Sequence, residues 1–251
     1  WPTEALDFYA FNPGTVSDDM LGFYSWEVTK DVQKIRYSCI DEYGAGTHAN
    51  YDVMYAIAKD RTKDMNNGVV KFNFKHILSQ VVFKAKTEYD NMQVDINMIK
   101  IYNVKIGGVF TLPAAADVTG NWSDLDGLPS EASGLGTFTV VKDKPITVDG
   151  NDPVTNITAT TPMLNIPQKL TAWTVSGASK TKKGADDAKQ CYLEIACKIR
   201  QSGAYLLGSA DSYGTIYVPF GATWEPGKRY IYTLIFGGGY TDQGEAVLNP
   251  I

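Results

Sequence analysis

Cysteine is scarce in this sequence, and the few cysteines present do not suit a disulfide framework. The 251-residue chain has three, Cys39, Cys191 and Cys197, and an odd number this low does not build the disulfide network of a small secreted module. Cys191 and Cys197 are expected on one strand, about 20 Å apart at about 3.3 Å per residue, which is too far for a bond. We therefore expect three small buried side chains.

The sequence also lacks a long apolar run and an excess of positive charge. The longest nearly uncharged stretch, around residues 107–116, is interrupted by Thr111 and Pro113, whereas a membrane-spanning helix needs about 20 consecutive apolar residues. Lys and Arg total 23 against 28 Asp and Glu, which gives a net charge of −5. A negative balance repels phosphate backbones, so nucleic acid is not an expected partner.

Histidine is nearly absent, and no catalytic or metal-binding motif stands out. The two histidines, His48 and His76, are not part of a His-Glu-x-x-His helix, and the sequence has no Cys-x-x-Cys pair and no Gly-x-Ser-x-Gly nucleophile elbow. The adjacent acids Asp18-Asp19 and Asp186-Asp187 lie in loop-like sequence, where we expect solvated turns.

Two weak motif matches carry no further support. Gly44 to Ala49 matches Gly-x-Gly-x-x-Ala, but the residues after it do not form the expected helix pattern. Asp124 to Gly127 resembles the start of a calcium loop, but the twelfth position is Leu135 instead of an acid. We expect no enzyme, no cofactor and no metal site.

What the sequence does contain is an alternation of apolar and polar residues with a period of two. From Cys191 to Ile199 every second residue is apolar, which is typical of a half-buried strand. Similar segments separated by turn clusters are expected as strands: Leu6–Phe11, Ile35–Ile40, Val69–His76, Val81–Lys86, Val94–Val104, Val109–Leu112, Thr137–Val141, Met163–Ile166, Leu170–Val175, Thr215–Phe220 and Arg229–Phe236. About a dozen strands and few helical patterns favour an all-β fold built from β-sandwiches.

This number of strands exceeds a single sandwich, so two sandwiches in tandem are expected. We predict domains over residues 1–106 and 107–251, with the boundary at the flexible Gly107-Gly108, while the polar stretch Thr119 to Gly136 is an equally good linker by composition. Tyr51 to Lys63 fits neither period cleanly and is expected as a short helix.

The segment from Val69 to Lys86 predicts the environment of His76. Val70, Phe72, Phe74 and His76 share one face of the expected strand, which predicts a buried, structural His76. After Ser79 the apolar set shifts by one residue, which indicates a turn or bulge near Leu78 to Gln80.

Four separated segments combine into a recognisable set of motifs. Trp1-Pro2 is followed by LDFYAFNP at residues 6–13; residues 52–56 are DVMYA, residues 72–81 are FNFKHILSQV, and residues 224–232 are WEPGKRYIY, before Gly-Gly-Tyr at 238–240. In this order they resemble the Mfa-like branch of the fimbrillin family, whose signatures are WP…LDFYAYYP, DLMYA, F-x-H-A-L-S-x-V and W-x-P-G-K-x-Y-x-Y. The motif positions taken over as structural residues are Phe72, His76, Ser79, Trp224, Gly227 and Tyr230.

The resemblance implies a structural subunit of type V pili, or a related surface lipoprotein of anaerobic bacteria. It implies two transthyretin-like β-sandwich domains, export as an outer-membrane lipoprotein, proteolytic trimming and polymerisation by donor-strand exchange. The expected location is the cell surface, where such fimbriae support adhesion, and the expected partners are other pilin subunits.

The chain departs from the family pattern at both ends. It lacks a lipobox cysteine and the strands that usually precede the Trp-Pro signature, so the first sandwich is expected to be incomplete, and it stops at Asn249 to Ile251, before the expected terminal strand. The alternative function is a stand-alone glycan-binding module or tip adhesin, whose partner would be a host protein or glycan.

Overall fold

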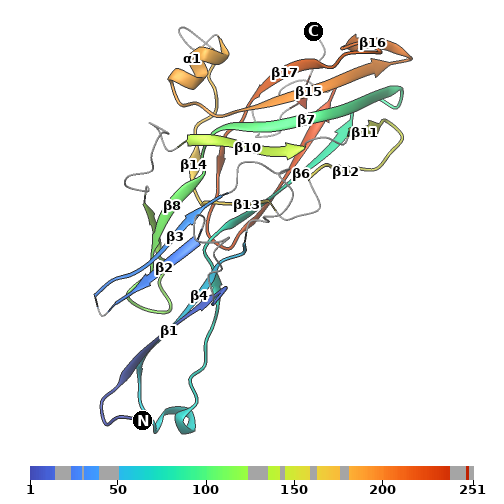
Figure 1. Ribbon diagram of the computed structural model, residues 1–251. Coiled ribbons are helices and arrows are strands. Elements are labelled where there is room, and N and C mark those ends of the chain that lie inside the picture. The colour runs from blue at the N-terminus through green and yellow to red at the C-terminus, as the bar shows by residue number, and fades with distance from the viewer. Residues whose placement is uncertain are drawn as a thin grey trace.

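The protein is built almost entirely from β-strands, as the alternating sequence predicts (Figure 1). The computed structural model describes residues 1–14, 24–29, 31–39, 51–123, 135–141, 145–158, 163–175, 181–237 and 247–248. These residues form twenty strands, the helix α1 (Lys182–Asp187) and a short 3-10 helix, η2 (Met65–Gly68). Within these ranges no helix is long and apolar enough to cross a bilayer. The predicted all-β class is confirmed.

Two sheets form the narrow end of the molecule that carries the N-terminus. Sheet 1 has the order β1 (Leu6–Asn12), β4 (Met54–Arg61), β5 (Lys75–His76), and sheet 2 has the order β2 (Tyr24–Val28), β3 (Gln33–Ser38), β8 (Gly107–Thr111), β9 (Asn121–Ser123). Aromatic rings join the two sheets: Tyr55 and Phe110 lie 5.3 Å apart, and Phe11 stacks on Trp26 at 5.7 Å.

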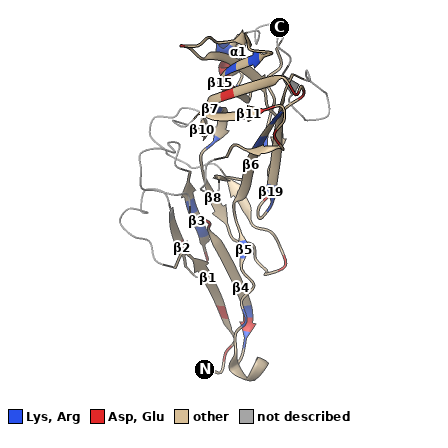
Figure 2. Cartoon of the chain, turned by 90° about the vertical axis from the view of Figure 1, so that its right-hand side faces the viewer, with Lys and Arg blue, Asp and Glu red and all other residues tan. Residues whose placement is uncertain are grey.

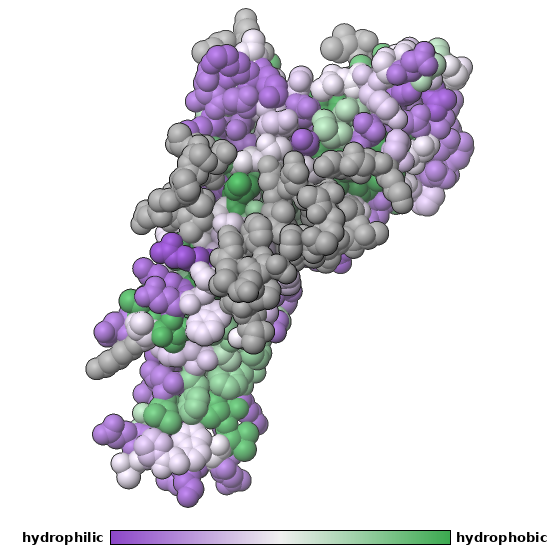
Figure 3. Space-filling view, in the orientation of Figure 1, coloured by the Kyte–Doolittle hydropathy of each residue, from purple (hydrophilic) through white to green (hydrophobic). Residues whose placement is uncertain are grey.

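Two larger sheets form the broad end in Figure 1 and Figure 3. Sheet 3 contains β12 (Thr155–Asn156) and β13 (Met163–Asn165) beside β6 (Ser79–Thr87), followed by β19 (Arg229–Phe236) and β20 (Val247–Leu248). Sheet 4 contains β10 (Leu135–Val141) and β11 (Ile146–Asp149) beside β7 (Met92–Lys105), followed by β15 (Tyr192–Gln201), which pairs with β16 (Ala204–Leu207) and β17 (Gly214–Pro219). A small ladder joins β14 (Lys169–Leu170) to β18 (Ala222–Thr223).

One hydrophobic core cluster includes buried residues of all four sheets, and on β15 it follows from the period of two. Leu193, Ile195 and Cys197 on β15 are fully buried, whereas Glu194, Ala196 and Lys198 on the opposite face are only partly buried. Burying an aliphatic side chain of this size contributes about 1.5–3 kcal/mol. On β7 the buried set changes phase between Ile96 and Ile99, because the pairing with β15 skips Asn97 at a bulge.

Three local predictions are wrong. Tyr51 to Lys63 is not helical but contains β4, whose consecutive buried residues from Tyr55 to Ala58 are covered on both faces and therefore show no alternation. Only Lys75–His76 of the segment Val69–His76 is a strand, and only Lys169–Leu170 overlaps the strand expected at Leu170–Val175.

Strand pairing crosses the boundary expected between residues 106 and 107. β6 and β7 precede it, yet they pair with β19 and β15, whereas β8 follows it and pairs with β3. If the fold divides into two units, each unit therefore contains strands from both sides of residues 106 and 107. The division into domains stays a prediction.

Candidate functional site

The motif residues near positions 76 and 227 come together where sheet 1 meets sheet 3. Residues Glu225 to Lys228 form a tight turn before β19, closed by the Lys228 N–H, which donates to the Glu225 carbonyl at 3.3 Å. Pro226 and Gly227 occupy its central positions, and Gly227 has φ of +69°. Proline followed by a glycine with positive φ fits a type II turn, which explains the Pro-Gly of this segment.

Hydrogen bonds fasten this turn to the start of β6. The Gly227 N–H donates to the Leu78 carbonyl at 2.8 Å, and the Gln80 N–H donates to the Lys228 carbonyl at 2.9 Å. The buried Ser79 hydroxyl donates to the Glu225 carbonyl at 2.8 Å. These bonds bring together two segments that lie far apart in the sequence and set the register of the parallel β6–β19 pair.

Aromatic side chains hold the other side of the turn. The buried indole of Trp224 donates to the Tyr232 hydroxyl at 3.0 Å, and the Tyr230 hydroxyl accepts a bond from the Glu225 N–H at 3.0 Å. Burial is the main cause of the raised pKa of Tyr232. Phe72 lies apart from the turn and contacts Phe74, at 6.4 Å between ring centroids. Five of the six motif positions therefore gather at one junction, and their structural role stays a prediction.

His76 is exposed, so the prediction that it is buried is wrong. Its side chain is 49% accessible, and its Nδ1 lies 2.9 Å from Asp52 Oδ1. The regular alternation inferred for Val69 to His76 fails because this segment is a strand only at Lys75–His76, where it pairs with Met54 and Tyr55. The buried run begins one residue later, at Ile77.

The His76–Asp52 pair forms one wall of a small pocket at the junction. The pocket encloses about 180 Å³, and its other lining residues are Leu78, Gln80, Leu164, Gly227, Lys228 and Arg229. Gln80 pairs with Leu164 on one side and with Arg229 on the other. The pocket thus spans β13, β6 and β19 at the end of sheet 3.

Metal-binding residue types do not cluster in the described part of the chain. Within these ranges no three His, Cys, Asp or Glu side chains lie close enough to hold a metal ion. Cys39, Cys191 and Cys197 are free and buried, as predicted, and burial raises the pKa of each thiol to about 12. His48, Asp18-Asp19, Gly44 to Ala49 and Asp124 to Gly127 lie outside the described residues.

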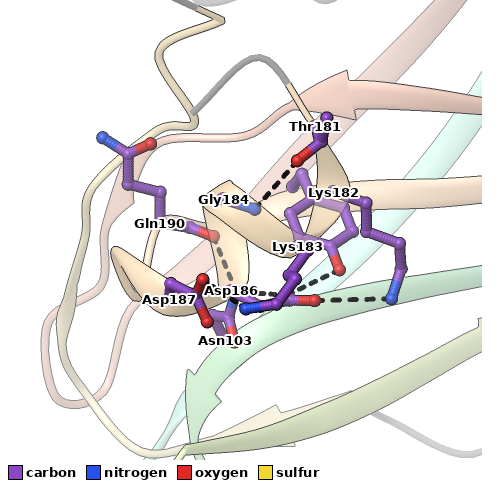
Figure 4. Close-up of polar contacts among 9 residues, drawn as sticks. Asn103, Thr181, Lys182, Lys183, Gly184, Asp186, Asp187 and Gln190 are labelled. Carbon is purple, nitrogen blue, oxygen red and sulfur yellow. Dashed lines mark hydrogen bonds and ion pairs between the residues drawn. The ribbon is translucent and has the colours of Figure 1, made fainter. Parts of the chain in front are cut away.

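The remaining acidic pair, Asp186-Asp187, lies on α1 and not in a loop (Figure 4). Asp186 accepts hydrogen bonds from the Tyr192 hydroxyl at 2.8 Å and from Asn103 Nδ2 at 3.1 Å, and Asp187 pairs with Lys183 at 2.6 Å. Burial and the bond to Asp186 raise the pKa of Tyr192. These contacts fix α1 to sheet 4, which is a structural role.

A second feature of the junction was not foreseen from the sequence. β19 pairs with β6 along all eight of its residues, but within the described chain β20 covers its other edge only at Ile235 and Phe236. From Arg229 to Leu234 that edge has no strand beside it among the described residues. The alternation of Tyr230, Tyr232 and Leu234 predicted the strand, but an alternation carries no information on how many neighbours a strand has.

Comparison with solved structures agrees with this architecture. A fimbrial protein from Bacteroides vulgatus superposes with a TM-score of 0.57 at 14% identity, over 90% of this chain and 72% of the other. Putative cell adhesion proteins from Bacteroides eggerthii and Bacteroides uniformis give TM-scores of 0.43 and 0.40 at 15% and 12% identity, over 97% and 92% of this chain and 72% and 67% of theirs. At 14% identity the similarity to the fimbrial protein concerns the fold alone, and the two lower scores support no conclusion.

Comparison at the level of sequence assigns the family. No curated protein matches the chain. The sequence model of the Mfa-like family, described as fimbrillin-like, matches residues 1–250, which is nearly the whole chain and includes all four motif segments. The chain therefore belongs to the fimbrillin-like family.

Proposed function

We propose that this chain is a structural subunit of cell-surface fimbriae and that its partners are other pilin subunits, joined by donor-strand exchange. Membership of the fimbrillin-like family supports the fimbrial role. The observation that carries the assembly mechanism is the edge of β19 between Arg229 and Leu234, which no described strand covers.

An uncovered strand edge offers unpaired backbone donors and acceptors to another chain. Along β19 the side chain of Leu234 is buried, and those of Tyr230 and Tyr232 are partly buried, so one face of the strand belongs to the core. A strand added beside β19 would continue the ladder and cover apolar side chains at the seam between sheets 3 and 4, which is the physics of strand addition. Ile231, on the other face, is 50% exposed.

The processing steps and the domain plan belong to the same proposal. Lipoprotein export to the outer membrane and proteolytic trimming would deliver a folded subunit whose acceptor edge is free. Two transthyretin-like sandwiches fit the aromatic contacts between sheets 1 and 2 and the separate strand pairing of sheets 3 and 4. In that plan β6 and β7 belong with the C-terminal strands, while β8 and β9 belong with the N-terminal ones.

The proposal is tested by blocking β19 in an assembly reaction. Ile231→Cys is labelled with a bulky polyethylene glycol maleimide, and the subunit is mixed with trimmed unlabelled subunits. We expect the labelled subunit to be absent from denaturant-resistant ladders, whereas a Tyr205→Cys control, on an exposed tyrosine of β16, is incorporated when labelled. Equal incorporation of both would contradict strand addition at β19.

A glycan-binding module is the second candidate, because exposed tyrosines gather on sheet 4. Tyr205, Tyr213 and Tyr217 are exposed, and Tyr217 is held edge-on by Trp173 and Tyr192 at 6.5 and 6.0 Å. Rigid exposed rings beside polar groups can stack on sugars. A saturable signal on a glycan array that is lost in Tyr217→Ala, with no ladders in the assembly reaction, would favour this function over the structural one.

A further inference from the structure

The outer face of sheet 4, which points away from the core, carries a row of three chemically different side chains. Glu194 on β15 lies directly opposite Tyr217 on β17 and, on its other side, opposite Lys100 on β7. Leu193 and Ile195, the neighbours of Glu194 along β15, point the other way and are fully buried. Lys100, Glu194 and Tyr217, which we call the outer row, therefore lie side by side on the surface.

The ring of Tyr217 is accessible and yet held in a fixed orientation. Tyr217 is 41% exposed. The buried rings of Trp173 and Tyr192 lie 6.5 and 6.0 Å from it, with interplanar angles of 72° and 78°. Edge-to-face contact is a preferred geometry of aromatic pairs, so the ring is ordered before a ligand arrives and little side-chain entropy is lost on binding.

Tyr217 differs in one respect from two other exposed tyrosines near it. The Lys198 ammonium group lies over the ring of Tyr213, 4.7 Å from its centroid, and the Arg200 guanidinium lies 5.7 Å from the centroid of Tyr205. In the described part of the chain no cation lies over the ring of Tyr217. Its surface is therefore left for a ligand.

The helix α1 borders the outer row on one side. Tyr102 lies opposite Tyr192 in the next row of the sheet, and their rings stack at 5.0 Å. Lys182 of α1 lies over the ring of Tyr102, 4.6 Å from its centroid, and pairs with Asp186. Figure 2 shows acidic and basic colour on α1 and on β15 at the upper end of the molecule. The outer row thus has a wall on one side.

The charges of the outer row balance, which favours an uncharged ligand. Among the described residues neither Glu194 nor Lys100 takes part in an ion pair. Burial, and after it the nearby Glu194 carboxylate, raise the pKa of Tyr102 to about 12. A carboxylate accepts hydrogen bonds and an ammonium group donates them, while a flat ring offers an apolar surface. A pyranose matches this set, because it has an apolar face of C–H groups and a rim of hydroxyls.

We propose that the outer row binds a neutral hexopyranose unit of a glycan. The apolar face of the sugar stacks on Tyr217, two adjacent hydroxyls donate to the Glu194 carboxylate, and the Lys100 ammonium group donates to another sugar oxygen. In a fimbria, many copies of one weak site gain avidity without any further contact. The inference rests on the second candidate of the proposed function and is independent of strand addition at β19.

A glycan array that carries neutral and sialylated oligosaccharides tests the ligand class. The fluorescently labelled chain should bind neutral glycans saturably, and sialic acid should not be required. Tyr217→Ala and Glu194→Gln should each lower the affinity for the best neutral glycan at least about tenfold, a loss of about 1.4 kcal/mol. Tyr217→Phe keeps the ring and should retain most of the affinity.

Two matched variants control for the loss of a ring or a charge elsewhere. Tyr205→Ala removes a tyrosine that is also 41% exposed but lies on β16, outside the outer row. Glu88→Gln removes an exposed carboxylate between β6 and β7. Both should bind like the unmodified chain. Near-UV circular dichroism verifies that Trp173 and Tyr192 stay packed in Tyr217→Ala.

The outcomes separate the sugar site from the fimbrial role. An absence of saturable binding to neutral glycans, or undiminished binding by Tyr217→Ala and Glu194→Gln, would overturn the site, while ladders that exclude the labelled Ile231→Cys subunit would still support strand addition. Neutral binding that is lost in both variants supports the site even if the labelled Ile231→Cys subunit enters ladders. Binding that requires sialic acid would overturn the neutral ligand.

Discussion

The strands β6 and β19 lie side by side and run parallel, yet they occupy different positions in their sheet. β6 has β12 and β13 on one side and β19 on the other, and its residues Val81, Phe83 and Ala85 are fully buried. β19 shows the same alternation, but among the described residues it has a full-length neighbour on one side only. Similar amino-acid patterns thus give a core strand in one case and, among the described residues, a strand with one largely unpaired edge in the other, and the difference arises from the neighbours.

The largest effect on the free energy of unfolding is expected in β6, because its side chains are more deeply buried than those of β19. Phe83→Ala should lower the free energy of unfolding by about 3–5 kcal/mol, because it leaves a cavity in the core. Ile231→Ala on β19 should change it by less than about 1 kcal/mol, because half of that side chain is already exposed. Chemical denaturation measures both values, and similar losses for the two variants would contradict the contrast.

The second largest loss of stability is expected from a substitution in the turn that leads into β19. Gly227→Ala places a Cβ on a residue with φ of +69° and should cost about 1–2 kcal/mol, the penalty of a left-handed conformation. Gly14→Ala is the matched control, because its φ is not positive and its nearest atom, the Phe11 carbonyl oxygen, is 3.6 Å away. We expect the control to retain the melting temperature of the unmodified protein.

The exposed pair at the junction should contribute little to stability. His76→Gln and Asp52→Asn are each expected to cost less than about 1 kcal/mol, since the bond between them is solvent-accessible. A double-mutant cycle isolates the energy of the pair. A coupling of several kcal/mol would show that His76 is buried in solution, as the sequence alone predicts.

The last prediction concerns the three cysteines, which we expect not to react with thiol reagents in the native protein. Burial raises the pKa of Cys39, Cys191 and Cys197 to about 12, so at pH 8 only about one thiol in ten thousand is a reactive thiolate. A thiol reagent should therefore label no cysteine in the native protein and all three in guanidinium. Rapid native labelling of any one of them would show that the core around it opens readily.

The sequence predicted the strands better than their arrangement. The predicted strand Arg229–Phe236 coincides with β19, because strong alternation between turn residues is a local signal. The parallel pairing of Gln80 with Arg229 brings together distant parts of the chain, and no local pattern encodes it. β4 was missed because burial on both faces removes the alternation, and His76 was misplaced because an apolar face in the sequence does not guarantee that another element covers it.

Of the candidate site, only the turn could be predicted from the sequence, because its residue types are specific for a tight turn. Pro226 and Gly227 indicate a tight turn without any structure, and the motif comparison singles out Trp224 and Tyr230 beside it. The bonds from Ser79 and Gly227 across to the opposite segment, and the pocket between Asp52 and Arg229, depend on tertiary contacts. They could be found only once the fold was known.

Amide hydrogen exchange across the two strands tests the central claim most directly. In the isolated subunit we expect backbone amides of residues 229–234 to exchange faster than those of residues 80–86, because no described strand covers that edge of β19. On assembly into fimbriae, protection should rise at residues 229–234 and remain unchanged at 80–86. Equal protection of the two strands in the free subunit, or a rise confined to other strands on assembly, would contradict β19 as the acceptor edge.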